Sequence, residues 1–157
     1  MRASTVEVTS VSAYEPAAQV CLDLYFDELA ARFPEGFERQ EDGAAELDDF
    51  VPPSGVFVMV RIFGEPAGCG ALRTLAPGIG EVRRMWVSPE VRGLGVGRRL
   101  LETLELAARE RKLRAVRLDA HSSLAEALQL YRSSGYREIP RYNDNPYAHH
   151  WLEKTLD

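Results

Sequence analysis

A glycine-rich segment, Arg92-Gly93-Leu94-Gly95-Val96-Gly97, separates two stretches of different hydrophobic periodicity. Before it, residues 80–87 form a β-rich run that predicts a strand. After it, apolar side chains recur at helical spacing along residues 96–112. A strand that turns through glycines into a helix presents backbone amides and the positive end of the helix dipole to an anion. The segment therefore predicts an α/β fold with a phosphate-binding cradle at the start of this helix.

Two common phosphate-binding motifs do not fit this segment. A P-loop requires Gly-Lys followed by Ser or Thr, whereas Gly97 is followed by Arg98 and Arg99. A dinucleotide-binding fingerprint that begins at Gly93 requires a third glycine at the position of Arg98, and it normally lies early in a βαβ unit. The alternatives that remain are an anion cradle of another kind and a glycine-rich turn without a ligand.

The rest of the chain alternates strand-like and helix-like patterns. Strands are predicted at residues 6–11, 56–62, 67–75, 80–87, 115–119, 136–140 and 148–155. Helices are predicted at residues 14–33, 96–112 and 124–131, with a short one at 44–50 inside an acidic loop broken by glycine and proline. This order predicts a mixed α/β fold in a single domain that spans residues 1–157.

The net charge of −5 argues against a nucleic-acid-binding protein, but it conceals a strong asymmetry. Residues 1–60 hold twelve acidic and three basic residues, whereas residues 61–157 hold twelve acidic and sixteen basic ones. Ten of the basic residues fall within residues 83–117, which include the glycine-rich segment. We therefore expect a basic surface beside the predicted cradle, suited to an anionic ligand.

Hydropathy and cysteine content argue against other classes of protein. The apolar run Val56–Val60 is far shorter than the ~20 residues that a membrane-spanning helix needs. The first residues are polar where a signal peptide would be apolar. Cys21 and Cys69 form no metal-binding or redox motif, which suits a reducing compartment. We therefore expect no membrane span and a cytoplasmic location.

Residues 81–101 closely resemble the acetyl-CoA-binding motif of the GNAT family of N-acetyltransferases. The family's pattern Gln/Arg-x-x-Gly-x-Gly/Ala is met at Arg92, Gly95 and Gly97. A second family signature lies at the expected distance downstream, and its matching residues are Ala127, Leu130, Tyr131, Gly135 and Tyr136. The resemblance covers residues 1–155 and implies the family's α/β fold, with a mostly antiparallel sheet of six to seven strands that is flanked by helices and splayed at the acetyl-CoA site.

The resemblance also implies which residues bind acetyl-CoA as co-substrate. The cradle that would take the pyrophosphate consists of Arg92, Gly93, Leu94, Gly95, Val96, Gly97 and Arg98, with further charge from Arg99. The backbone of Met85, Trp86 and Val87 matches the strand that pairs with the pantetheine arm in the family. The amide of Val87 is the expected partner of the thioester carbonyl. The alternative for these three residues is an ordinary central strand.

Two residues are implied to be catalytic. Tyr131 matches the family's general acid, and its phenol, with an ordinary pKa near 10, is protonated at neutral pH. Glu81 lies four residues before Met85, at the position of a general base that some members use directly or through water. Such a base would help because only about 0.1% of a lysine-like amine is neutral at pH 7.4. The alternatives are a core tyrosine and an exposed glutamate paired with Arg73 or Arg83.

One departure from the family lies at the end of the strand at residues 115–119, where many relatives have an asparagine. Here the nearby residues are His121-Ser122-Ser123. His121 is predicted to contact the cofactor or the acceptor, to titrate, or to lie in a solvated loop. His149 and His150 are adjacent, so they point to opposite faces of a strand, and we assign no metal.

The acceptor is expected to be the primary amine of a small molecule. The acidic residues between 35 and 49 suit a cationic amine, although a solvated acidic loop is an equal alternative; they are Glu35, Glu38, Glu41, Asp42, Glu46, Asp48 and Asp49. Phe33, Phe37, Tyr142 and Tyr147 are candidate pocket residues. The rival hypotheses are a protein or peptide N-acetyltransferase and a silent acyl-CoA-binding module. A homodimer is possible, and neither nucleic acid nor a membrane is expected as a partner.

Overall fold

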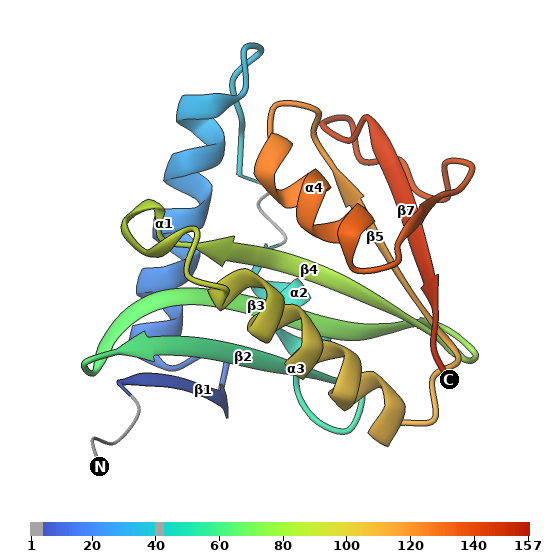
Figure 1. The fold of residues 1–157 in the computed structure, drawn as a ribbon, viewed down its shortest axis with the longest axis horizontal. Helices are drawn as coiled ribbons and strands as arrows, with labels where there is room; N and C mark the ends of the chain where they lie inside the picture. The colour runs from blue at the N-terminus through green and yellow to red at the C-terminus, as the bar shows by residue number, and fades with distance from the viewer. Residues whose placement is uncertain (1–4, 40–42) are drawn as a thin grey trace.

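The computed structural model describes residues 5–39 and 43–157, which form one seven-stranded sheet with helices on both of its faces (Figure 1). The strands are β1 (Val6–Val11), β2 (Gly55–Ile62), β3 (Glu65–Ala76), β4 (Ile79–Val87), β5 (Ala115–Ala120), β6 (Arg137–Glu138) and β7 (His150–Thr155). The helices are α1 (Pro16–Arg32), α2 (Gly43–Asp48), α3 (Val96–Glu110) and α4 (Ala125–Ser133), and a 3-10 turn covers Pro89–Val91. The predicted α/β fold and order of elements are confirmed.

The sheet has the order β1-β2-β3-β4-β5-β7-β6, and every neighbouring pair is antiparallel except β4 with β5. The parallel pairing is short, because only residues 79–81 of β4 face residues 115–117 of β5. Beyond this point the two strands diverge (Figure 1). The sheet is therefore splayed at the carboxyl ends of β4 and β5, and among the described residues no strand pairs with the end of β4 on that side.

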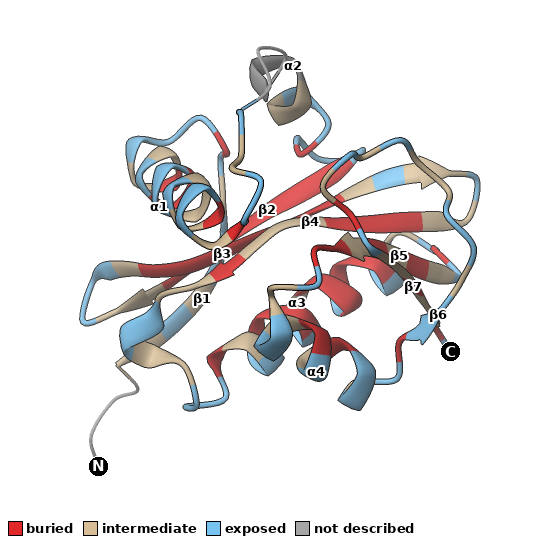
Figure 2. Cartoon of the chain, turned by 90° about the horizontal axis from the view of Figure 1, so that it is seen from above, coloured by how far each residue is buried: buried red, intermediate tan, exposed pale blue. Residues whose placement is uncertain are grey.

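Helix α1 covers one face of the sheet, whereas α3 and α4 cover the other (Figure 2). On the α1 face, Cys21 and Leu22 pack with Phe57, Met59 and Trp86. On the opposite face, the apolar stripe of α3 packs mainly against β2, β3 and β4. The core on this face includes Leu100, Leu104, Val116, Leu118 and Leu128. The helical spacing of the apolar residues thus produces the two layers that enclose the sheet.

A β-bulge in β4 decides which side chains face which layer. Ala71 of β3 pairs with Arg83 and Cys69 pairs with Trp86, so two residues of β4, Arg84 and Met85, lie opposite Gly70 alone. Arg84 adopts a φ of 55°, which lies in the left-handed region. The extra residue reverses the alternation of the strand. After the bulge, Trp86 faces the α1 layer, whereas Met85 and Val87 pack with the α3 and α4 core.

The bounds of most elements differ from the predicted ones by a few residues. The strand expected at residues 136–140 is limited to Arg137–Glu138. The amide of Ile139 still donates to the carbonyl oxygen of Trp151 at 2.8 Å, but Pro140 has no amide to continue the pairing. The first long helix begins at Pro16, where a proline suits the first helical position. Among the helices of the described residues, none has the length and apolarity needed to cross a membrane.

Candidate active site

The glycine-rich segment forms an open cradle at the start of α3. Gly93 and Gly95 have φ angles of 87° and 78°, and a Cβ built on either glycine would meet no atom within 4 Å. Gly95 is the N-cap of α3, and no side chain caps this helix end. The first amides of a helix have no intrahelical partner, so here they point outward with the positive end of the helix dipole. The cradle therefore has both the space and the donors for an anion.

A cavity of about 270 Å³ leads from this cradle between α1, β4 and α4. It is lined by nine of the predicted cofactor-binding and catalytic residues, which are Met85, Trp86, Val87, Arg92, Gly93, Gly95, Gly97, Arg98 and Tyr131. Two predicted cofactor-binding residues do not line it: the side chain of Leu94 is 72% exposed, and that of Val96 is buried in the core. These two residues belong to the cradle only through their backbone.

Val87 offers its amide to the splayed side of the sheet. The amide of Ser88 donates to the carbonyl oxygen of Ala67 on β3, with a nitrogen to oxygen distance of 2.9 Å. Since successive amides along a strand point to opposite edges, the amide of Val87 points away from β3. That edge faces the gap from which β5 has diverged. The predicted donor is therefore directed into the cavity that Val87 lines.

Arg92 is held by Glu28 of α1, a residue that the sequence analysis did not identify. A nitrogen of its guanidinium lies 2.6 Å from both carboxylate oxygens of Glu28, and its Nε donates to the carbonyl oxygen of Val87 at 3.0 Å. Trp86 donates from Nε1 to Glu28 at 2.9 Å. Burial acts to raise the pKa of Glu28, but the donors Arg92, Trp86 and Arg32 outweigh it and lower that pKa. Arg92 therefore fastens α1 to the end of β4, and its charge is shared with Glu28.

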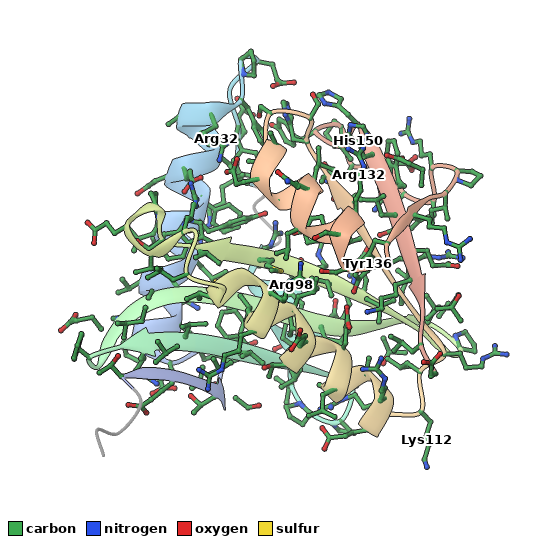
Figure 3. All side chains as sticks on the ribbon, viewed as in Figure 1. Arg32, Arg98, Lys112, Arg132, Tyr136 and His150 are labelled. Atoms are coloured by element: carbon green, nitrogen blue, oxygen red, sulfur yellow. The ribbon has the colours of Figure 1, made fainter. Side chains whose placement is uncertain are left out.

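Arg98 lies at the start of α3, beside the end of α4 (Figure 3). Its guanidinium donates to the hydroxyl of Ser133 at 3.0 Å and to that of Ser134 at 3.3 Å. Both partners are neutral, so the positive charge of Arg98 is not neutralised by them. Arg98 thus adds positive charge at the mouth of the cavity.

Tyr131 of α4 is buried, with 6% of its surface exposed, yet its hydroxyl has no hydrogen-bond partner among the described residues. Among the described residues, every side-chain oxygen that is fully shielded from solvent has a hydrogen-bond partner. The unpartnered hydroxyl of Tyr131 is therefore not fully shielded, and it opens to the cavity that Tyr131 lines. Burial raises the pKa of Tyr131 above its ordinary value, and the nearby Tyr25 and Asp119 raise it further. The hydroxyl is therefore protonated at neutral pH and free to donate.

A second cavity, of about 700 Å³, meets the first at Tyr131. The two share the lining residues Tyr25, Leu29, Met85, Leu124, Ala127 and Tyr131. The second cavity continues from this junction towards the loop after α1 and the loop before β7, and Phe33, Phe37 and Tyr147 line it as predicted. Two cavities thus adjoin at one tyrosine.

Glu81 lines neither cavity. Its side chain is 1% exposed, and it accepts hydrogen bonds from Arg73 Nε at 2.8 Å and from the Tyr142 hydroxyl at 2.6 Å. Arg83 lies 3.4 Å away. Glu81 and Met85 are four residues apart and would share a face of a regular strand, but the bulge at Arg84 turns Met85 to the opposite layer. The candidate base is therefore a buried member of an ion-pair network, and Tyr142 belongs to the same network rather than to the cavity lining.

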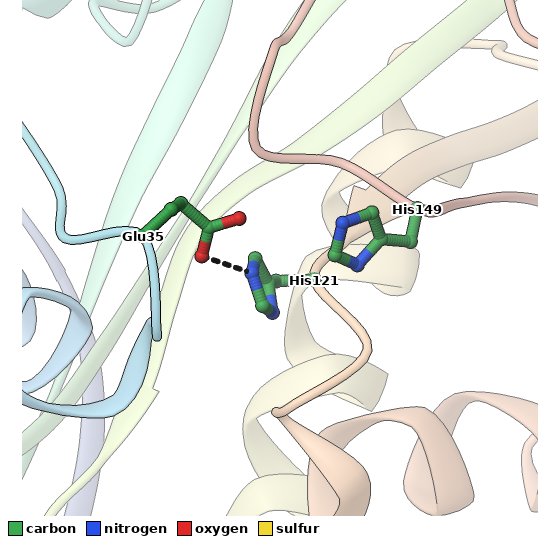
Figure 4. A group of neighbouring side chains, drawn as sticks. All are labelled: Glu35, His121 and His149. Atoms are coloured by element: carbon green, nitrogen blue, oxygen red, sulfur yellow. Dashed lines mark hydrogen bonds and ion pairs between the residues drawn. The ribbon is translucent and has the colours of Figure 1, made fainter.

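His121 is buried and lines the second cavity, so it is not a solvated loop residue. Its ring stacks on Phe33 with a centroid distance of 3.8 Å. Nδ1 accepts a hydrogen bond from the amide of Ser123 at 3.0 Å, which places the ring hydrogen on Nε2. Nε2 then donates to Glu35 at 2.9 Å, across the gap between the loop after α1 and β5 (Figure 4).

Glu35, His121 and His149 bring potential metal-ligand atoms within 4.8 Å of one another, a cluster that the sequence analysis did not foresee. The geometry of the rings favours hydrogen bonding over metal binding. Nδ1 of His149 accepts from the amide of Ser122 at 3.1 Å, as Nδ1 of His121 does from Ser123. Each ring therefore carries its hydrogen on Nε2 and keeps no free lone pair, whereas metal-bound histidines donate their second ring nitrogen.

The acidic segment contributes only part of its charge to the second cavity. Glu46 and Asp49 line it, and Glu46 is bonded by Arg83 and Arg84. Burial acts to raise the pKa of Glu46, but the charges of Arg84 and Arg83 outweigh it and lower that pKa. Glu38 and Asp48 are absent from the lining, and Glu41 and Asp42 lie outside the described residues.

Comparison with known proteins defines the class to which this fold and site belong. Residues 22–136 match the model of the acetyltransferase (GNAT) family. A relative from Azospirillum brasilense named IAA acetyltransferase is 34% identical over 118 residues, which cover 74% of this chain and 72% of the relative. The chain therefore belongs to the GNAT family of acetyltransferases.

Solved structures agree with this assignment at the level of the fold. An acetyltransferase of the GNAT family from Staphylococcus aureus has a TM-score of 0.81 at 16% identity, with 97% of this chain and 99% of that chain covered. The PaiA N-acetyltransferase of Thermoplasma acidophilum in complex with coenzyme A has a TM-score of 0.75 at 16% identity, with 96% and 99% covered. As a member of this family, the protein is an acyltransferase that uses acetyl-CoA.

Proposed function

We propose that the protein transfers the acetyl group of acetyl-CoA to the primary amine of a small molecule, by direct attack while both substrates are bound. The observation that carries the proposal is that the two cavities meet at Met85 and Tyr131. An acyl donor in the first cavity and an amine in the second would approach each other at this junction. Direct attack requires such a shared junction, because reacting atoms must lie about 3–3.5 Å apart.

The first cavity fits acetyl-CoA, which supplies an activated thioester when bound. The open faces of Gly93 and Gly95 and the uncapped amides of α3 suit the pyrophosphate. Arg98 supplies positive charge that neutral serines leave available. The amide of Val87 faces the side on which the pantetheine arm would lie, and it is the donor best placed for a thioester carbonyl. Arg92 acts on the site indirectly, by fixing the carbonyl of Val87 and the position of α1.

Tyr131 is the proposed general acid. The amine nitrogen forms a bond to the acetyl carbon, the carbon–sulfur bond breaks, and Tyr131 gives its hydroxyl proton to the sulfur. Solvent returns a proton to Tyr131 and accepts those that the nitrogen loses. We assign Glu81 a structural role instead of that of base, because its oxygens are occupied by Arg73 and Tyr142 and it lines neither cavity.

The shape of the second cavity supports a small acceptor over a protein chain. The Glu35–His121 contact joins the loop after α1 to the end of β5, and a tilted ring contact between Phe37 and Tyr147, at a centroid distance of 4.8 Å, joins it to the loop before β7. These contacts bridge the segments on either side of the cavity, where a polypeptide substrate would need an open groove. The name of the Azospirillum brasilense relative, IAA acetyltransferase, is compatible with a small-molecule acceptor.

The test is a panel of amines assayed for thiol release from acetyl-CoA, with each acetylated product identified by mass spectrometry. The panel contains small primary amines, amino acids and lysine-containing peptides. We expect release with at least one small amine and little with the peptides. Preferential acetylation of peptides would replace the small-molecule proposal, and binding of coenzyme A without turnover of any amine would indicate a silent acyl-CoA-binding module.

We also propose that residues 1–157 form one catalytic domain and that the protein acts in the cytoplasm. Cys21 and Cys69 are both free and buried, which supports a reducing compartment. A homodimer stays a prediction, and sedimentation at several protein concentrations tests it.

A further inference from the structure

Asp119, near the carboxyl end of β5, lines the second cavity on the side where the sheet is splayed. The side chains of β5 alternate, so Asp119 faces the same layer as Arg117, while Leu118 and Ala120 enter the core. Its negative charge also acts on Tyr131, whose pKa it helps to raise. Asp119 is therefore a carboxylate close to the junction at which the two cavities meet.

The other charged groups around Asp119 are already paired with one another. Arg83 and Arg84 bind Glu46, and Arg73 binds Glu81 and Asp49. On the neighbouring position of β5, Arg117 binds Glu153 at 2.7 Å. Within residues 5–39 and 43–157, Asp119 has no ion-pair partner within 4.0 Å. The second cavity thus contains a carboxylate whose charge is not matched by a cation in contact with it.

Two neutral amides hold Asp119 in place. Asn143 donates to Oδ2 at 2.6 Å, and Asn145 donates to Oδ1 at 3.0 Å. The orientation of both amides is fixed, because Oδ1 of Asn143 accepts from Trp151 Nε1 and Oδ1 of Asn145 accepts from the amide of Tyr147. Each carboxylate oxygen has two lone pairs, so each keeps one acceptor position. The carboxylate is therefore positioned in advance and still able to accept hydrogen bonds from a ligand.

An aromatic cluster lines another part of the same cavity. It consists of Phe26, Phe33, Phe37 and Tyr147. Phe37 stacks on Phe26 at a centroid distance of 5.7 Å and contacts Phe33 at 5.8 Å. The cavity therefore combines one unmatched anionic group with an apolar, aromatic wall, which suits a ligand with one cationic end and one apolar end.

We propose that Asp119 binds the ammonium group of the acceptor, and that the acceptor is a primary amine on an apolar or aromatic body that packs against the aromatic cluster. This inference rests on the proposed function and names the chemical class of its acceptor. Asp119 is thus an acceptor-binding residue, and the arginines of the cavity make their contact ion pairs with other carboxylates, Glu46, Asp49 and Glu81.

The experiment measures steady-state thiol release with 2-phenylethylamine for the wild type, Asp119→Asn and the control Asp23→Asn. Asp23 is an exposed aspartate of α1 that pairs with Arg39 and lines neither cavity. Loss of a charge-assisted hydrogen bond predicts a rise in KM for the amine of about tenfold to a hundredfold in Asp119→Asn. The KM for acetyl-CoA is expected to be unchanged, and Asp23→Asn is expected to match the wild type.

A second measurement does not depend on the folding of a variant. The neutral analogue 2-phenylethanol, used as a competitive inhibitor of the wild type, is expected to bind at least tenfold more weakly than the amine. Propylamine, which has no aromatic body, is expected to have a higher KM than 2-phenylethylamine.

The outcomes separate this inference from the proposed function. If the wild type turns over the amine and Asp119→Asn has the same KM for it, or differs only by a lower kcat, the binding role of Asp119 is overturned while the acetyltransferase proposal stands. Equal binding of the alcohol and the amine would do the same. Equal KM values for propylamine and 2-phenylethylamine would remove the aromatic part. If the wild type released thiol with none of the amines, that result would instead overturn the proposed function.

Discussion

The hydroxyl of Tyr142 donates a hydrogen bond of 2.6 Å to Oε2 of Glu81, and this contact joins the segment before β7 to the middle of the sheet. Burial and the charge of Glu81 together raise the pKa of Tyr142, so the phenol stays protonated and continues to donate. With Arg73 on the other carboxylate oxygen, Glu81 has the partners of a structural residue.

Replacing Glu81 is therefore expected to affect stability more than chemistry. Glu81→Gln leaves Arg73 and Arg83 without their shared buried partner, and breaking such a pair costs about 3–5 kcal/mol of unfolding free energy. Urea unfolding measures this loss, and thiol release per folded molecule is expected to stay within a few-fold of the wild type. Glu153→Gln, which removes the part-exposed pair with Arg117, serves as the control and is expected to cost under about 1 kcal/mol. An equally stable Glu81→Gln variant without turnover would restore Glu81 as the base.

Tyr131→Phe is expected to lower kcat by about 10²- to 10⁴-fold, the range typical of a lost general acid. The hydroxyl has no partner among the described residues, so its removal should leave the melting temperature and the affinity for coenzyme A nearly unchanged. Tyr136→Phe is the matched control, because Tyr136 is also buried but donates to Glu105 at 2.8 Å and lines neither cavity. That variant should lose stability and keep its kcat. A lowered kcat in Tyr136→Phe together with a wild-type kcat in Tyr131→Phe would contradict the assignment of Tyr131 as the general acid.

Gly95→Ala is expected to weaken the binding of coenzyme A by tenfold or more, measured by calorimetry. The methyl group would occupy the open cradle, and a φ of 78° costs an alanine roughly 1–2 kcal/mol. Gly64→Ala separates these two effects, since Gly64 has a φ of 81° and open space around it but lies in the turn between β2 and β3. Both variants should lose similar stability. If Gly64→Ala weakened coenzyme A binding equally, the cradle would not be the cause.

The stability of the protein is expected to fall in acid partly through Glu46. Its pKa is lower in the folded state than in the unfolded chain, so its contribution is present above about pH 4.3 and is lost as the pH falls through the folded-state pKa. Glu46→Gln should lower the unfolding free energy at pH 7 by about 3 kcal/mol, because Arg83 and Arg84 lose their partner. Its stability should then vary less than that of the wild type between pH 6 and pH 3. Glu102→Gln, at an exposed position of α3, should reproduce the wild-type curve, and a parallel curve for Glu46→Gln would contradict the prediction.

Much of the fold follows from patterns of short range. The helical spacing along α3, the alternation along β5 and the glycines at residues 93–97 each depend on neighbours within a few positions of the chain, so the order of elements was predictable. The cradle was predictable for the same reason, because a strand, a glycine-rich turn and the first turn of a helix follow one another directly along the chain. Tyr131 could be proposed as the general acid because the second family signature lies within and just after α4.

The tertiary structure decided the roles that depend on where distant segments meet. The bulge at Arg84 places Glu81 and Met85 on opposite layers, and a one-residue shift of this kind leaves no mark in the alternation of the sequence. Glu28 reaches Arg92 only because α1 packs beside the end of β4. Among the described residues, Asp119 has no ion-pair partner, because the arginines around it bind Glu46, Asp49 and Glu81. The sequence by itself determined the elements and the glycine-rich turn before α3, whereas long-range packing determined which carboxylates pair with arginines and which one does not.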